Sequence, residues 1–89
     1  MGQADATHTG LAQAVGRFPD QAPLLRRLVL KDTAFRSLCE DYALARASLA
    51  GFEARSDAAE RPEIADYRAV IAELESEIAR FVTAAGQAG

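Results

Sequence analysis

The sequence predicts an all-α protein built on a long antiparallel helical hairpin of the coiled-coil type. Of the 89 residues 20 are Ala, whereas 7% are aromatic and Trp is absent, a composition that favours helix over strand. Two segments carry apolar residues at alternating spacings of three and four, which is typical of helices with one buried stripe. A short segment without apolar anchors separates them, and this predicts a loop.

The N-terminal third predicts a tail followed by one or two short helices. Residues 1–9 are small and polar, so we expect a mobile tail there. A weak helical patch follows, and a second short helix is expected over 24–30 with Asp20 as its N-cap. Both are expected to pack near the open end of the hairpin. Residues 10–83 then form one helical domain, and 84–89 form a C-terminal tail.

The first hairpin helix is expected over 33–54, because Asp32 or Thr33 can cap its free amide groups. The second is expected over 62–83, with the loop at 55–61. The apolar stripes consist of Phe35, Leu38, Tyr42, Ala45, Leu49 and Phe52 in the first helix, and Ile64, Tyr67, Ile71, Leu74, Ile78 and Phe81 in the second.

The two stripes can be aligned as core partners, because paired residues of an antiparallel hairpin have a constant sum of residue numbers. Each layer then joins an a position to a d position, as antiparallel coiled coils require. The pairs are Phe52 with Ile64, Leu49 with Tyr67, Ala45 with Ile71, Tyr42 with Leu74, Leu38 with Ile78, and Phe35 with Phe81. Since one stripe per helix makes a small core, we expect a third helix or a second copy of the chain to complete it.

The motif LKDTAFRSLCEDY at 30–42 combines a capping residue with Phe, Leu and Tyr at heptad spacing, and it resembles the opening of the YdcH-like proteins. The segment LESEI at 74–78 is similar to the acidic ending of that family. The resemblance covers roughly 24–82 and implies a small bacterial helical hairpin with an interaction role. This chain departs from the family in its Ala and Arg content and its longer N-terminal extension. The family carries no established catalytic or ligand residues, so none is transferred.

Several chemistries are disfavoured by what the chain contains. One Cys excludes an internal disulfide, and Cys39 with His8 cannot build a zinc site of the usual kind. We interpret Cys39 as a small buried hydrophobe rather than a redox site. Glu73 and Glu77 lie one helical turn apart but lack the Glu-x-x-His partners of a carboxylate-bridged metal site, so a solvated face is favoured. We therefore expect no enzyme activity, metal, cofactor or small-molecule substrate.

The cell interior, hence the cytoplasm, is the expected location. Residues 1–16 hold neither a basic n-region nor a continuous apolar h-region of a secretory signal. No apolar run approaches the ~20 residues that span a bilayer.

Charge is distributed unevenly around a formal net charge of −3 and a pI near 5.0. Residues 17–36 hold five basic and two acidic residues, whereas 37–89 hold five basic and ten acidic ones. We expect a non-enzymatic, self-associating module, a homo-oligomer that also binds an unidentified protein partner. An adaptor for nucleic acid or an anionic membrane surface, acting through 17–36, is the less favoured alternative. The expected surface residues are Arg26, Arg27, Lys31, Arg36, Leu28, Leu44 and Val70.

Overall fold

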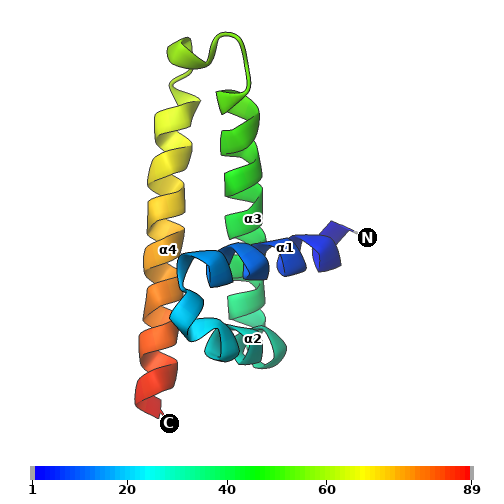
Figure 1. Cartoon of the computed structure of the whole chain (residues 1–89), viewed down its shortest axis with the longest axis vertical. Helices are drawn as coiled ribbons and strands as arrows, with labels where there is room; N and C mark the ends of the chain where they lie inside the picture. The colour runs from blue at the N-terminus through cyan, green and yellow to red at the C-terminus, as the bar shows by residue number, and fades with distance from the viewer. Residues whose placement is uncertain (1, 89) are drawn as a thin grey trace.

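The computed structural model describes the backbone of residues 2–88 and the side chains of residues 6–86. Two helices that run antiparallel and side by side form a hairpin, which confirms the predicted all-α class (Figure 1). Two more helices lie across one face of this hairpin. The helices are α1 (Gly2–Arg17), α2 (Ala22–Lys31), α3 (Thr33–Glu53) and α4 (Glu63–Ala88), with short 3₁₀ turns η1 (Pro19–Gln21) and η2 (Ala58–Glu60) in the links.

The N-termini of α2 and α3 are stabilised in different ways. Asp32 is the N-cap of α3, because its Oδ1 accepts a hydrogen bond from the Phe35 amide at 3.1 Å. The expectation that Asp20 caps α2 is wrong, since Asp20 lies within η1 and α2 begins without a side-chain cap. The η1 turn leads directly into α2, and the Ala22 amide donates to the Pro19 carbonyl instead. A backbone hydrogen bond therefore takes the place of a side-chain cap at the N-terminus of α2.

Helix α1 corrects the expected tail at 1–9, because the chain is helical from Gly2. Its packing against α3 gives the physical reason. Gly10 and Ala14, one turn apart, are both buried, and Cys39 of α3 lies against Gly10. The Thr7 hydroxyl donates to Glu40 Oε2 at 2.6 Å. Small side chains thus let the α1 backbone approach α3, and this contact stabilises a helix whose own apolar pattern is weak.

The C-terminal tail expected at 84–89 is also helical as far as Ala88. Ala84 and Ala85 are strong helix formers and no Pro interrupts the segment, while Gly86 costs only about 1 kcal/mol relative to Ala. The link between α3 and α4 covers 54–62 and contains η2, close to the loop expected at 55–61.

The core lies where α1 and α2 cover the half of the hairpin nearest its open end. Its fully buried side chains come from every helix of the described chain: Ala14, Leu25, Phe35, Cys39, Tyr42 and Ile78. Of the other stripe residues, Leu38, Ala45 and Ile71 are buried, and Leu49, Tyr67, Leu74 and Phe81 pack half-buried against the core. The N-terminal helices therefore supply the third layer that the two stripes lack.

Ring contacts at the two ends of the hairpin show how the two stripes meet there. Phe35 and Phe81 meet edge to face, with ring centroids 5.3 Å apart. At the other end Phe52 stacks on Tyr67 at 5.8 Å, whereas Ile64 was the expected partner. Tyr67 lies one turn along α4 from Ile64, which lines a hollow together with Ala58 and Ala59 of η2.

Candidate functional site

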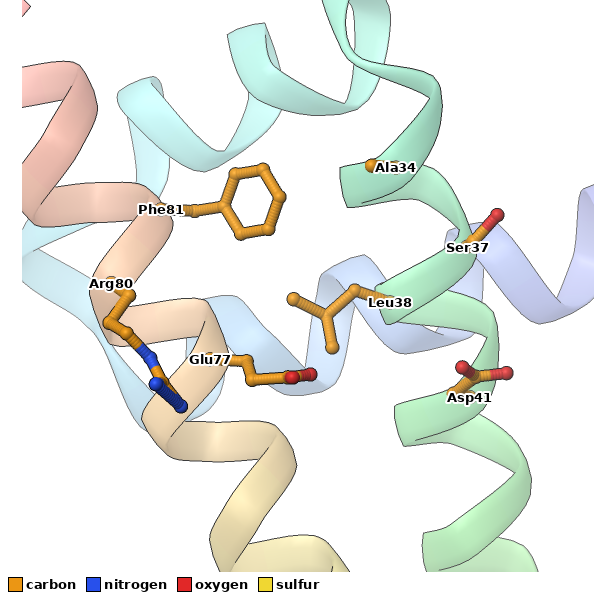
Figure 2. A pocket seen from close by; sticks show the side chains of 7 residues that line it. All are labelled: Ala34, Ser37, Leu38, Asp41, Glu77, Arg80 and Phe81. Atoms are coloured by element: carbon orange, nitrogen blue, oxygen red, sulfur yellow. The ribbon is translucent and has the colours of Figure 1, made fainter.

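The hairpin face that α1 and α2 leave open carries a groove between α3 and α4. We call this hollow of about 630 Å³ the hairpin groove (Figure 2). Glu77 and Phe81 extend from α4 toward α3, and Leu38 extends from α3 into the same space, while α1 and α2 lie behind the hairpin in this view. The lining residues are Ala34, Ser37, Leu38, Asp41, Glu77, Arg80 and Phe81.

The hairpin groove has an apolar floor and a charged rim. Leu38 is buried and Phe81 is half-buried, so the floor presents hydrocarbon and an aromatic ring. Asp41, Glu77 and Arg80 are exposed at the rim, and none of these three forms an ion pair within the described part of the chain. The groove thus offers unpaired charges of both signs around an apolar centre.

The apolar surface continues from the hairpin groove along α4. Val70 and Leu74 precede Glu77 and Phe81 at spacings of four, three and four, which places all of them on one side of a helix. Val70 is 43% exposed and Leu74 is half-buried. Leu44, also expected on an interaction surface, is 62% exposed. It follows the groove-lining residues Ser37 and Asp41 at spacings of seven and three, so it continues the groove side of α3 toward the loop.

The outer side of α2 forms a second candidate surface. Leu25 is fully buried and Leu28 packs against the core, which corrects the expectation that Leu28 is a surface anchor. The exposed apolar residue is Leu30, at 79%. The helical turn of 100° per residue could have indicated this, because it places position 30 nearly opposite position 25.

The basic residues expected on this surface fall into two groups. Arg26, Arg27 and Lys31 are exposed. Arg36 instead forms hydrogen bonds within the fold. Its Nη1 donates to the Val29 carbonyl at 2.8 Å, and its Nη2 donates to Thr33 Oγ1 at 3.1 Å. A guanidinium that satisfies a free carbonyl at the end of α2 is a C-terminal cap of that helix.

Cys39 and Tyr42 have perturbed acidities with structural causes. Burial raises the pKa of the Cys39 thiol to about 11, and the nearby Glu40 carboxylate adds to the effect. Burial, with a hydrogen bond to Glu75, also raises the pKa of the Tyr42 hydroxyl above its usual value. Both groups are therefore neutral near pH 7, and a protonated, covered thiol is a poor nucleophile.

Residues considered for metal binding do not converge within the described part of the chain. No group of three or more His, Cys, Asp or Glu side chains is arranged there to hold a metal ion. His8 lies on α1 and lines a small hollow beside α2, far in sequence from Glu73 and Glu77 on α4.

No family model, curated protein or solved structure matches this chain. The resemblance to YdcH-like proteins therefore stays a prediction. Within the described residues, no helix combines the length and the hydropathy needed to cross a membrane.

Proposed function

We propose that the chain is a non-enzymatic protein-interaction module that self-associates through the hairpin groove. The observation that carries this proposal is the groove itself, an apolar floor bordered by three charged side chains that form no ion pair with any described residue. The interaction role also agrees with the resemblance to YdcH-like hairpins.

Burial of apolar surface supplies the driving force of this association. Leu74 and Phe81 are only half-buried and Val70 is exposed, so a second hairpin laid on this face removes hydrocarbon from water. The gain is about 25 cal/mol for each Å² of apolar surface covered. Two hairpins packed in this way form a four-helix arrangement, whose helices prefer crossing angles of about 20°.

The charges at the rim make the groove self-complementary. In a two-fold dimer each protomer offers the same patch, so that if one residue meets another, the reciprocal contact also forms. Arg80 of one copy can then meet Asp41 or Glu77 of the other, and the same pair forms twice. Such pairs select orientation and partner more than they add affinity.

The test is sedimentation equilibrium of the full chain and of two matched variants. Val70→Glu puts a charge on the groove side and is expected to weaken association at least tenfold, because a carboxylate is then buried in the interface. Leu30→Glu adds the same charge to an exposed apolar position on the outer side of α2, away from the groove, and is expected to leave association unchanged. Circular dichroism verifies that both variants retain their helices.

Charge exchange tests the rim contacts separately. Arg80→Glu is expected to weaken association, and the double variant Arg80→Glu with Glu77→Arg restores both signs and is expected to recover it. A wild-type chain that stays monomeric at millimolar concentration, or an equal loss in Val70→Glu and Leu30→Glu, would overturn the proposal.

A further inference from the structure

Beyond self-association, the outer side of α2 presents a surface of different chemistry. Arg26, Arg27, Leu30 and Lys31 share this side, since Leu25, Leu28 and Val29 occupy the opposite one against the core. We call these four residues the basic face. Its three cations surround a leucine that is 79% exposed.

The charge of the basic face is not compensated locally. Across the described residues, Arg26, Arg27 and Lys31 form no ion pair, whereas Arg17, Arg55, Arg61 and Arg68 each have a carboxylate partner. The nearest carboxylate in sequence, Asp32, accepts the hydrogen bond that caps α3. A surface of three free cations in an acidic chain is complementary to an anionic partner.

An apolar hollow adjoins the basic face between α1 and α2. It measures about 240 Å³ and is lined by Leu11, Ala12 and Val15, with His8 and Arg26 completing it. Arg26 therefore belongs to both the hollow and the basic face. Cations beside hydrocarbon match a partner that is anionic at one end and apolar at the other.

We propose that the basic face and this hollow bind an anionic phospholipid membrane. Arg26, Arg27 and Lys31 contact headgroup phosphates while Leu30 inserts at the boundary with the acyl chains, an arrangement typical of helices that lie in a membrane interface. Nucleic acid fits less well, because an exposed leucine and an apolar hollow have no role against phosphodiesters and the face carries no aromatic side chain for base stacking.

The test is co-sedimentation of the full chain with lipid vesicles. Vesicles of mixed phosphatidylcholine and phosphatidylserine are expected to bind the protein, and vesicles of phosphatidylcholine alone are not. Each basic residue at an anionic surface strengthens partitioning by about fivefold, so Arg26→Gln with Arg27→Gln and Lys31→Gln is expected to weaken it by about a hundredfold. Leu30→Ser leaves the charge unchanged and is expected to weaken it by about tenfold.

A charge-matched control separates the face from the overall charge. Arg46→Gln, Arg55→Gln and Arg68→Gln together remove the same three charges from the far half of the hairpin and are expected to change partitioning by less than about threefold. Equal binding to neutral vesicles, or equal loss in both triple variants, would contradict the proposal. So would duplex RNA binding that depends on the three cations but not on Leu30. Because these variants leave the hairpin groove intact, sedimentation equilibrium tests self-association independently.

Discussion

At the scale of single residues, Gly10 of α1 lies directly against the backbone of Cys39 in α3. A Cβ added at Gly10 would lie 2.6 Å from the Cys39 carbonyl carbon and nearer still to its oxygen. That carbonyl belongs to the interior of α3 and cannot move without distorting the helix. Gly16, in the same helix as Gly10, has open space where a Cβ would be added. The fold therefore requires a glycine at position 10 but has room for a larger side chain at position 16.

We expect Gly10→Ala to lower the free energy of unfolding by at least about 2 kcal/mol, because α1 must shift away from α3. Gly16→Ala is expected to raise it by about 0.5–1 kcal/mol, because Ala is the better helix former. Urea unfolding followed by circular dichroism measures both. Similar effects of the two substitutions would contradict the contact between α1 and α3.

The raised pKa of the buried Cys39 thiol predicts that the fold loses stability at alkaline pH. The thiol has its ordinary pKa of about 9 in the unfolded chain and about 11 in the folded one, so the unfolded state loses its proton first and unfolding becomes more favourable as pH rises through this window. The loss is at most about 2–3 kcal/mol. Cys39→Ala removes this contribution while Tyr42 continues to titrate. Urea unfolding at pH 8–11 measures the free energy of unfolding of both proteins. That of the wild type is expected to fall more steeply with pH than that of Cys39→Ala. A difference between the two that stays constant with pH would contradict this prediction.

At the scale of helices, a polar contact joins α3, α4 and the end of α1. The Tyr42 hydroxyl donates to Glu75 Oε2 at 2.8 Å, and Arg17 Nε lies 3.5 Å from Glu75 Oε1. Tyr42 is fully buried, so its hydroxyl needs an acceptor at the place where three helices meet. Glu75 meets that need and also holds the last turn of α1.

We expect Tyr42→Phe to lower the free energy of unfolding by about 1 kcal/mol and Glu75→Ala by about 1–2 kcal/mol, because the second change leaves the buried hydroxyl without its acceptor. The double variant is expected to cost less than the sum, since both remove one shared bond. Glu73→Ala, at an exposed position half a turn away, is the control and is expected to change stability by less than about 0.5 kcal/mol. An equal cost for Glu73→Ala would contradict this role of Glu75.

The sequence predicts the hairpin helices α3 and α4 better than helices α1 and α2, which cover one face of the hairpin. Strict spacings of three and four indicated α3 and α4, and the acidic side chain before Thr33 correctly suggested Asp32 as a cap. Only the second half of helix α1 was predicted. The first half was missed because α1 docks through Gly10 and Ala14, whose small side chains carry no hydrophobic signal. The hairpin groove was missed for another reason: Asp41, Glu77 and Arg80 become neighbours only when two helices distant in sequence pack together.

At the scale of the whole molecule, the fold is elongated. Its radius of gyration is 14.0 Å, whereas about 12 Å is expected of a compact chain of this length. The cause is visible in Figure 1, where α1 and α2 cover only the half of the hairpin near its open end. The far half is held mainly by contacts between α3 and α4, among them the stacked Phe52 and Tyr67.

Deletion of residues 1–17 is expected to lower the free energy of unfolding by about 3 kcal/mol or more, because Leu11, Ala14 and Val15 leave the core. The Cys39 thiol is expected to react rapidly with a maleimide in this variant and slowly in the full chain. Deletion of residues 84–89 at the other end of the chain is the control and is expected to change stability by less than about 1 kcal/mol. Slow labelling after loss of 1–17 would show that α1 does not cover Cys39.

The hairpin has two different sides. Helices α1 and α2 lie on one of them, and the hairpin groove lies on the other. Any two-fold assembly formed through the groove turns both α2 helices outward, in opposite directions. Such a particle is bivalent, and its two basic faces cannot rest on the same flat surface. It would bridge two surfaces instead of coating one, so that clustering of vesicles, visible as turbidity, would depend on both sides of the same small hairpin.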